Sequence, residues 1–554
     1  MRYLFLVFVI AGWLPAAADP LPPVAAIASA HPIATAAGFE VLEAGGNAFD
    51  AAVAVSATLA VVEPYSSGLG GGGFWLLHRA ADNSDIMLDG RETAPGKASR
   101  NMYLDTRGEV VPGRSVDGPL AAGIPGEPAA LVWLAEKYGR LPLKTSLVPA
   151  IRAAEQGFAV TAHYRRMAQF RLDALRASPA AAAVFLHNND VPPLGQLISQ
   201  PDLALTLERL ANQGHQGFYG GKLAQALVQG TDAAGGIWRL EDLRDYRVIE
   251  RAPIISEYRG YRIVSAAPPS SGGVALVTML NILQGYPLET LSAQQRKHRV
   301  IEAMRRAYRD RAEYLGDPDF VKVPVAELTS PAHAAELRSS IQPDSATPSQ
   351  ALKPVASPAG GFHTTHFSIL DRAGNRVAAT LSINYPFGSG FMPPGTGVLL
   401  NDEMDDFSAK PGVPNVYGLV GAEANAIAPG KRMLSSMSPT FVEGPDRIAI
   451  LGTPGGSRII TMVLHGILGV TENKSAQQIV SEPRYHHQYL PDVVQYEAGS
   501  LTEKDQDDLQ LMGHQLKQLD QPYGNMQAVI WNRKTNTVSA ASDPRGEGQA
   551  RVGP

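Results

Sequence analysis

Thr364 and Ser382 are two hydroxyl side chains that could carry covalent chemistry in this sequence. The chain contains no cysteine, which excludes disulfides, thiolate metal sites and cysteine nucleophiles. A covalent catalyst must then be a serine, a threonine, a lysine or a carboxylate. A hydroxyl becomes a strong nucleophile only with a proton acceptor beside it, so the structure around these two hydroxyls decides what they can do.

A β-hairpin is predicted directly after Thr364. Residues 365–371 (THFSILD) and 376–383 (RVAATLSI) are β-type runs, and a turn at residues 373–375 joins them. Folding back about this turn makes the two hydroxyls near neighbours. Threonine and serine are common structural residues in strands, so the pair alone does not define an active site.

The register of this hairpin can be predicted from the turn. A turn centred on residues 373–375 places Thr364 opposite Ile383 or Asn384. Ser382 is then one or two residues away from the position opposite Thr364.

Two glycine-rich loops could bind anionic groups. Gly455 and Gly456 lie between a predicted strand, residues 447–451, and a predicted apolar helix, residues 457–470. Backbone N–H groups at such a helix N-terminus can stabilise an oxyanion, although tight turns also require glycine. The other loop, SSGLGGGG at residues 66–73, contains G-x-G-x-x-G, but it follows a helix and precedes a strand. A dinucleotide site has the opposite order, so we do not expect one.

Acidic and histidine clusters raise the question of a metal site. The run at residues 402–406 (DEMDD) is acidic, but its spacing fits no standard calcium loop. His486 and His487 are neighbours in an extended segment, so their side chains point to opposite faces, and the sequence offers no third ligand at a suitable spacing. We therefore expect no metal site and interpret the two histidines as structural.

Helices and strands alternate in blocks along the chain. Residues 34–62 read as two helices around a Gly-Gly-Asn turn, in which Asn47 and Asp50 resemble a capping box. The charged amphipathic stretch 294–314 predicts a helix with a solvated charged face. Residues 339–361 are dense in Pro, Ser and Ala, which indicates a mobile, exposed connection that tolerates processing. The fold class is α/β or α+β, with layered sheets covered by helices.

The composition is that of a large globular protein. Of its 554 residues, 45% are hydrophobic and 18% charged, which allows a substantial core. A net charge of -5 and a pI near 6.2 provide no basic surface for nucleic acid. Residues 1–18 combine Arg2, a short apolar run and a final Ala-Ala-Ala, which is typical of a secretory signal peptide rather than a membrane span. We expect a secreted protein, with the periplasm as its location.

Several long motifs resemble those of γ-glutamyltransferases, which are N-terminal nucleophile hydrolases. The segment TTHFSILDRAGNRVAATLSINYPFG, which begins at Thr364, resembles the signature of that family. NDEMDDFSAKPGVPNVYGLVG, KRMLSSMSP and GTPGGSRIIT resemble its later motifs in the same order, and EPYSSGLGGGGF and RETAP resemble its earlier ones. The resemblance runs from about residue 24 to about residue 545. It implies an α+β fold in the form of a four-layer αββα sandwich.

The resemblance also implies that the chain cuts itself between His363 and Thr364. The products would be a large subunit, residues 19–363, and a small catalytic subunit, residues 364–554. The Thr364 hydroxyl would perform the cut through an N-to-O acyl shift, and the liberated α-amine would then act as its base. Such an amine has an unperturbed pKa of roughly 7.7–8.0, against about 10.4 for lysine, so a useful fraction is unprotonated near neutral pH.

Roles for the other candidates follow from the same resemblance. Ser382 would hydrogen-bond the nucleophile, and it stands where relatives usually have Thr, so a hydroxyl is retained. Gly455 and Gly456 would form the oxyanion hole. Tyr417, in a lid loop at residues 411–421, would reach across the substrate. The γ-glutamyl group would be held by Arg91, Ser435 and Ser436 at its α-carboxylate and by Asn384, Glu403 and Asp406 at its α-ammonium.

The implied reaction is attack of Thr364 on the γ-amide of glutathione or a related γ-glutamyl compound, followed by transfer to water, an amino acid or a peptide. The resemblance implies no metal and no organic cofactor. The expected partners are the small-molecule substrate and the two subunits, without nucleic acid and without a stable membrane span once the signal peptide is removed.

Two alternatives remain open. One is a relative with another acyl substrate, such as a glutaryl-cephalosporin acylase or an enzyme that acts on poly-γ-glutamate. Arg91, Asp406 and the two serines argue against the glutaryl substrate, because a glutaryl group lacks the ammonium that Asp406 would pair with. The other alternative is a non-catalytic exported binding protein on the same scaffold.

Overall fold

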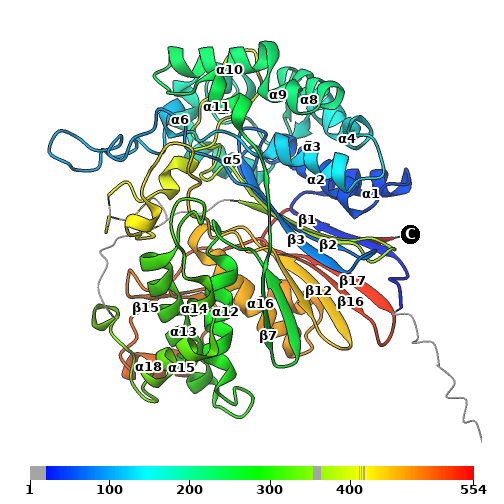
Figure 1. Cartoon of the computed structure of the whole chain (residues 1–554). Helices are drawn as coiled ribbons and strands as arrows, with labels where there is room; N and C mark the ends of the chain where they lie inside the picture. The colour runs from blue at the N-terminus through cyan, green and yellow to red at the C-terminus, as the bar shows by residue number, and fades with distance from the viewer. Residues whose placement is uncertain (1–19, 353–363, 411, 414, 416–417, 554) are drawn as a thin grey trace, which may run out of the picture.

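Two stacked sheets form the centre of the computed structural model, which describes residues 20–352, 364–410, 412–413, 415 and 418–553 (Figure 1). All strand pairs in these two sheets are antiparallel. The first sheet has the order β18 (Gln549–Gly553), β1 (Ala25–Ser29), β9 (Thr365–Leu370), β10 (Arg376–Ser382), β2 (Gly72–Arg79), β3 (Ser84–Gly90) and β6 (Ile249–Arg251). The second has the order β17 (Thr537–Ser542), β16 (Gln527–Asn532), β12 (Arg447–Gly452), β11 (Thr440–Glu443), β8 (Tyr261–Ser265) and β7 (Ile254–Tyr258).

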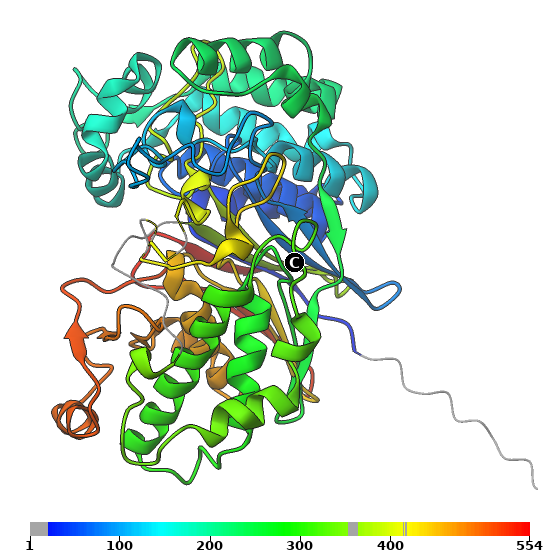
Figure 2. The same cartoon turned by 60° about the vertical axis from the view of Figure 1, so that its left-hand side comes forward.

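Helices gather on the two outer sides of the paired sheets, as Figures 1 and 2 show. The group on the side of the first sheet is α1 (Pro32–Glu43), α2 (Ala48–Val62), α3 (Glu127–Lys137), α4 (Leu143–Gln156), α5 (Ala162–Phe170), α6 (Leu172–Ala177), α7 (Pro179–Phe185), α8 (Pro201–Gln213), α9 (His215–Tyr219), α10 (Gly221–Ala233) and α11 (Leu240–Asp245). The group on the other side is α12 (Gly272–Gln284), α13 (Ala293–Tyr314), α14 (Val325–Leu328), α15 (Pro331–Ser339), α16 (Ile459–Thr471), α17 (Ala476–Ser481) and α18 (Glu503–Leu511). The predicted αββα sandwich of the α+β class is therefore confirmed.

Short elements complete the description. The small strands are β4 (Phe158–Ala159), β5 (Leu197–Ile198), β13 (Tyr485–His486), β14 (Val494–Tyr496) and β15 (Leu516–Gln518). The single turns of 3₁₀ helix are η1 (Pro119–Ala121), η2 (Ser349–Ala351), η3 (Glu403–Asp406), η4 (Glu423–Asn425) and η5 (Gly456–Arg458). None of the helices in the described part of the chain has the length and apolar character that crossing a membrane requires. The predicted signal peptide, residues 1–18, lies outside the described residues.

Side chains alternate between the two faces of each strand, so the strands contribute to two separate hydrophobic cores. In β2, Trp75 and Leu77 pack into the cluster shared with α2 and α3, whereas Phe74 and Leu76 point into the cluster between the sheets. Successive strand side chains face opposite sides of a sheet, so a strand buried on both faces must be apolar at nearly every position. This explains the uninterrupted apolar run at residues 74–77 of β2.

The predicted hairpin is confirmed, but its register differs by one or two residues from the prediction. The ladder pairs Thr365 with Leu381, so Thr364 lies opposite Ser382 rather than opposite Ile383 or Asn384. The reason is the turn, which closes with the N–H of Asp371 donating to the carbonyl of Asn375 and so begins earlier than predicted. The two hydroxyls are thus directly opposite each other.

Local capping explains where other predicted elements begin. Asn47 and Asp50 form the capping box of α2, as predicted. The helix predicted to begin at residue 457 begins at Ile459, because the turn η5 precedes it.

The charged face of α13 was predicted to be solvated, and this prediction is wrong. Glu302, Arg305 and Arg306 are at most 2% exposed. They lie in a network of ion pairs that includes Asp492 from a distant segment. Ser349, inside the predicted exposed connection, is also buried and accepts a hydrogen bond from Arg305 at 2.6 Å. Residues 353–363 of that connection lie outside the described residues.

Candidate active site

Thr364 and Ser382 meet at the ends of β9 and β10. The Thr364 hydroxyl donates to the Ser382 hydroxyl at 3.5 Å, which is a long hydrogen bond. Thr364 is 6% exposed and Ser382 3%. The Ser382 hydroxyl in turn accepts the backbone N–H of Asn384 at 2.7 Å. Ser382 is therefore held in place, with its hydroxyl directed at Thr364.

Asn384 follows in an unusual backbone conformation. Its φ of 73° lies in the left-handed region, which asparagine tolerates better than most residues. Its side-chain amide donates to the carbonyl of Asp402 at 3.0 Å. This bond ties the end of β10 to the acidic segment that contains η3.

Arg91 joins two carboxylates of that acidic segment. It follows β3, and its guanidinium donates to Glu403 and to Asp406, each at 2.5 Å. Glu92 is a weaker third partner at 3.4 Å. Arg91 is only 1% exposed, so these ion pairs have little solvent around them. The cluster therefore places a cation in direct contact with carboxylates.

Burial shifts the ionisation of this cluster. It raises the pKa of Glu403 to about 7, against the opposing effect of Arg91. It also raises the pKa of Glu92 well above its ordinary value, with the charge of Glu403 as a further cause. Burial alone would lower the pKa of Arg91, but the three surrounding carboxylates outweigh it and raise that pKa. Arg91 therefore stays charged.

The glycine pair lies where β12 leads into α16. Gly455 and Gly456 have φ values of 142° and 55°, which side-chain-bearing residues rarely adopt. A Cβ at Gly455 would stand 2.4 Å from the Cε of Met462. The backbone conformation therefore requires glycine at position 455, whereas the Met462 methyl group, at the end of a flexible side chain, could move aside. Gly455 is the N-cap of the turn η5 and Gly456 is its first residue, so the backbone of the pair is presented at the start of a helical segment.

Ser435 and Ser436 lie on an irregular segment before β11. The N–H of Ser435 donates to the carbonyl of Pro269 at 2.8 Å, which fixes the backbone. The Ser436 hydroxyl accepts a hydrogen bond from Arg311 at 3.2 Å. The two serines are 2% and 8% exposed.

Arg311 is a site residue that sequence reasoning missed. It belongs to α13 and is 5% exposed. Burial lowers its pKa, whereas the nearby charge of Asp406 acts in the opposite direction. The arginine-rich pattern of α13 gave no signal to separate Arg311 from a solvent-exposed arginine.

One small cavity of about 20 Å³ brings most of the predicted residues together. Its lining includes Arg91, Thr364, Ser382, Asn384, Glu403, Asp406, Ser435, Ser436 and Gly456. Gly455 lines the neighbouring cavity, which Thr364 also lines. Tyr417, the predicted lid residue, lies outside the described residues. The hydroxyl pair, the charged cluster and the glycine turn thus surround one point.

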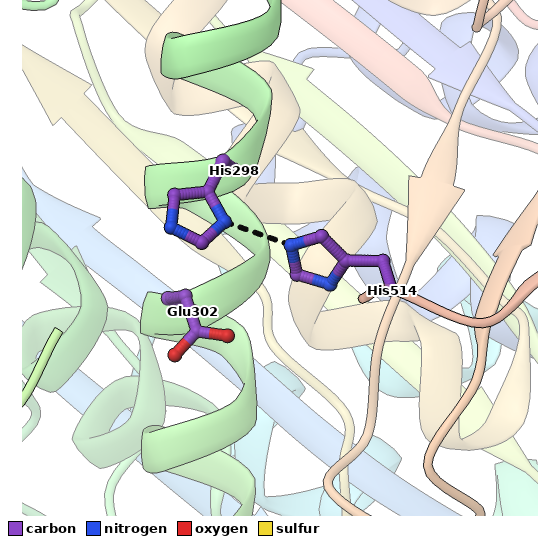
Figure 3. A group of neighbouring side chains, drawn as sticks. All are labelled: His298, Glu302 and His514. Atoms are coloured by element: carbon purple, nitrogen blue, oxygen red, sulfur yellow. Dashed lines mark hydrogen bonds between the residues drawn. The ribbon is translucent and has the colours of Figure 1, made fainter. Parts of the chain in front are cut away.

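Figure 3 shows a second group of polar side chains, His298, Glu302 and His514, that are close enough to share a metal ion. The two rings hydrogen-bond each other at 2.8 Å. The Glu302 oxygens already accept from Arg305 and Arg306. Two adjacent arginines oppose a cation, so we interpret this group as structural.

His486 and His487 are likewise engaged with protein groups. His486 contacts Thr461 and Gln488 at 2.8 and 2.9 Å. His487 contacts Asp492 at 3.1 Å. The two rings thus have different partners, in agreement with the structural interpretation made from the sequence.

Two stacked sheets enclosed by helices, with a buried threonine directly before a central strand, are the architecture expected of an N-terminal nucleophile hydrolase. A family model described as Gamma-glutamyltranspeptidase matches residues 34–553. The chain belongs to this family.

Individual relatives support the assignment. A protein named glutathione hydrolase proenzyme from Pseudomonas sp. (strain A14) is 44% identical over 536 residues, which are 94% of this chain and 92% of that protein. A cephalosporin acylase from Bacillus halodurans has a similar structure, with a TM-score of 0.84, 27% identity and 99% of both chains covered. Helicobacter pylori gamma-glutamyltranspeptidase has a TM-score of 0.58 and 41% identity, over 62% of this chain and 97% of that chain.

Proposed function

We propose that this protein is a glutathione hydrolase and γ-glutamyltransferase that uses Thr364 as its nucleophile. The observation that carries the proposal is the placement of the Thr364 and Ser382 hydroxyls beside the Arg91, Glu403 and Asp406 cluster in one cavity. A γ-glutamyl amide presents a carbonyl to the hydroxyl and an α-amino acid head to the charged cluster. The name of the Pseudomonas relative, glutathione hydrolase proenzyme, supports the same substrate and a precursor that is processed.

Processing would break the chain between His363 and Thr364. The Thr364 hydroxyl attacks the carbonyl of residue 363, and the resulting ester is hydrolysed to leave a free α-amine on Thr364. The predicted large subunit, residues 19–363, is 62% of the sequence. The same share of this chain is matched by the Helicobacter pylori chain, as expected if that chain is a separate large subunit.

The new α-amine supplies the base for catalysis. Its unperturbed pKa of roughly 7.7–8.0 leaves a useful fraction unprotonated at neutral pH. It can therefore accept the proton of its own hydroxyl as the hydroxyl attacks the γ-carbonyl. Ser382 orients that hydroxyl, and the N–H groups of Gly455 and Gly456 would stabilise the oxyanion. Water or an amine then takes the acyl group from Thr364.

The charged cluster would recognise the head of the glutamyl group. Arg91 would bind the α-carboxylate together with Ser435 and Ser436, through charge-assisted hydrogen bonds of about 1.5–3 kcal/mol each. Glu403, Asp406 and Asn384 would bind the α-ammonium. Both groups are attached to one carbon, so a site for both needs a cation and a carboxylate close to each other, as Arg91 and Asp406 are.

The site would have to open to admit this substrate. A cavity of about 20 Å³ holds little more than one water molecule. Segment 411–421 is the natural candidate for the moving part, because Asn415 donates to Asp406 at 3.1 Å and Leu419 lines the cavity. Tyr417 would act as a lid residue that shields the acyl-enzyme from bulk water. We further propose export to the periplasm, from the signal-like residues 1–18.

A cephalosporin acylase activity is the second candidate, because the structure of the Bacillus halodurans acylase covers nearly the whole chain. A glutaryl group has a carboxylate but no ammonium. It would leave Glu403 and Asp406 without a counter-charge from the substrate, which is costly in a buried site. We therefore expect a γ-glutamyl anilide to be cleaved faster than the matching glutaryl anilide, and the reverse order would favour the acylase.

One preparation tests the main proposal. Wild-type protein should give two bands on a denaturing gel, with Thr364 as the N-terminus of the smaller one, and should release p-nitroaniline from a γ-glutamyl anilide. The Thr364→Ala variant should give a single band and no release. Processing that persists in this variant would indicate an outside protease and contradict the mechanism.

A further inference from the structure

The turn that follows β10, residues 384–388, has an unusual backbone and begins at a residue of the site. Asn384, Phe387 and Gly388 have φ values of 73°, 57° and 53°, so two side-chain-bearing residues lie in the left-handed region within four positions. A bulky residue such as phenylalanine rarely adopts this region, and such a conformation persists only where the surrounding structure holds it. The contacts of this turn therefore decide how Asn384 is presented to the small cavity that it lines.

Arg171 binds this turn although it does not line the small cavity around Thr364. It lies between α5 and α6 and is 7% exposed. Its Nε donates to the carbonyl of Pro386 at 3.0 Å, and its Nη2 donates to the carbonyl of Gly388 at 2.7 Å. Its guanidinium also lies 5.2 Å from the centre of the Tyr385 ring. One side chain from a distant segment thus contacts three residues of the turn.

The charge of Arg171 acts mainly towards the turn and its surroundings. Its ion-pair partner, Asp117 at 2.8 Å, has a side chain that is 55% exposed, and water screens a pair of this kind. On the buried side, burial raises the pKa of Asp402 well above its ordinary value, and the charge of Arg171 is the main effect that opposes this rise. Arg171 therefore favours the ionised form of a carboxyl that is bonded to the turn.

The turn in turn holds two parts of the site. The backbone N–H of Asn384 donates to the Ser382 hydroxyl at 2.7 Å, and its side-chain amide donates to the carbonyl of Asp402 at 3.0 Å. The backbone N–H of Tyr385 donates to the carboxylate of Asp402 at 2.9 Å. Asp402 directly precedes Glu403. The turn is thus bonded both to the hydroxyl that faces the nucleophile and to the segment that carries the site carboxylates.

We propose that Arg171 is a positioning residue for donor binding, which holds the turn 384–388 so that Asn384 faces the α-ammonium of the glutamyl group. The inference rests on the proposed function. Without the two hydrogen bonds from Arg171, the carbonyls of Pro386 and Gly388 lose a buried donor, and the turn is free to leave the left-handed region. Asn384 then loses its orientation, and the α-ammonium is bound less tightly.

The first test is the KM for a γ-glutamyl anilide in the Arg171→Gln variant. We expect this KM to rise about tenfold, close to the loss of one hydrogen bond to a charged group, with a smaller change in kcat. The variant should still be processed into two fragments. Arg176→Gln is the matched control, because Arg176 is exposed on α6 and donates to Asn189 rather than to the turn. Its KM should stay at the wild-type value.

A double-mutant cycle tests whether Arg171 acts through Asn384. If it does, Arg171→Gln combined with Asn384→Ala should have about the same KM as Asn384→Ala alone, because there is no longer an amide to orient. Two independent effects would multiply instead. Arg171→Lys retains the charge but cannot donate to both carbonyls in the same geometry, so its KM should lie between those of the wild-type protein and Arg171→Gln.

Each outcome bears on a different proposal. An unchanged KM in Arg171→Gln, or effects that multiply in the cycle, would overturn this inference. So would the loss of a cooperative thermal transition in both Arg171 variants, because Arg171 would then support the whole fold rather than the turn. Failure of the wild-type protein to release p-nitroaniline would instead contradict the proposed function.

Discussion

At the scale of single residues, the site depends on charges that are buried together. Arg91 is in contact with Glu403 and Asp406 and is almost fully buried. Removing one partner of such a cluster leaves an uncompensated charge, which costs more than the pair contributes. Conservative changes that retain shape therefore give clearer answers than alanine at these positions.

Glu403→Gln should make donor binding less dependent on pH. Burial raises the pKa of Glu403 to about 7, so the carboxyl is mostly neutral below that pH and ionised above it. The KM of the wild-type enzyme for a γ-glutamyl anilide should therefore fall as pH rises through about 7, because an ionised Glu403 attracts the α-ammonium. The amide does not titrate, so the KM of the variant should change little over this range. A variant that keeps the wild-type slope would show that another group titrates.

Arg311→Lys tests whether the missed arginine positions the substrate-binding serine. Arg311 donates to Ser436 at 3.2 Å and to Ser271 at 3.0 Å. The single ammonium of lysine cannot make both hydrogen bonds in this geometry. We expect the donor KM to rise about tenfold, the loss of one charge-assisted bond, with a smaller change in kcat. A fall in kcat alone would contradict a role in binding.

At the scale of elements, α13 is a charged helix that the fold has buried. The carboxylate of Glu302 accepts from Arg305 and Arg306, and Arg305 also contacts Asp492. The backbone N–H of Thr347 donates to Glu302 at 3.1 Å. This network attaches the segment before residue 353 to the body of the protein, so the end of the predicted large subunit would have a fixed anchor near the predicted processing site.

Glu302→Gln should destabilise the protein by about 3–5 kcal/mol, because it leaves two buried arginines without their shared carboxylate. The thermal unfolding midpoint measures the effect. Although burial opposes the charged form, Arg305 and Arg306 lower the pKa of Glu302 to about 2, from 4.5. A lowered pKa in the folded protein stabilises it at pH values above the unfolded-state pKa, and this stabilisation is lost as pH falls. The difference in stability between the variant and the wild-type protein should therefore narrow between pH 4.5 and pH 2. A constant difference would mean that Glu302 contributes by packing alone.

Local patterns predicted the elements well, and contacts between distant segments poorly. The capping box at Asn47 and the hairpin after Thr364 depend on neighbours in sequence, which is why both could be predicted. The burial of Arg305 and Arg306 depends on Asp492 and Thr347, which no periodicity connects to α13. The charged cluster around Arg91 is similar, since Glu403 and Asp406 lie more than 300 residues away. Only the resemblance to a family placed those residues together before the structure did.

At the scale of the whole molecule, the predicted cut does not follow a boundary between domains. In the first sheet, β9 and β10 come after Thr364, but their outer neighbours β1 and β2 come before it. β9 pairs with β1 from Phe367 to Leu370, and β10 pairs with β2 along its full length. β18, from the end of the chain, pairs with the other edge of β1. The two products would thus share one continuous sheet.

The processed fragments should therefore remain together under native conditions. Size-exclusion chromatography of the wild-type protein should give a single peak that contains both fragments, close to the elution volume of the uncut Thr364→Ala variant. Separation requires breaking the ladders that β1 and β2 form with β9 and β10, along with the core between the sheets, so it should occur only with unfolding, for example in about 6 M guanidinium chloride. Fragments that separate in dilute native buffer would contradict the interleaved sheet. Separation would also remove Arg91 from the site around Thr364. Activity should therefore be lost when the peak that contains both fragments is lost.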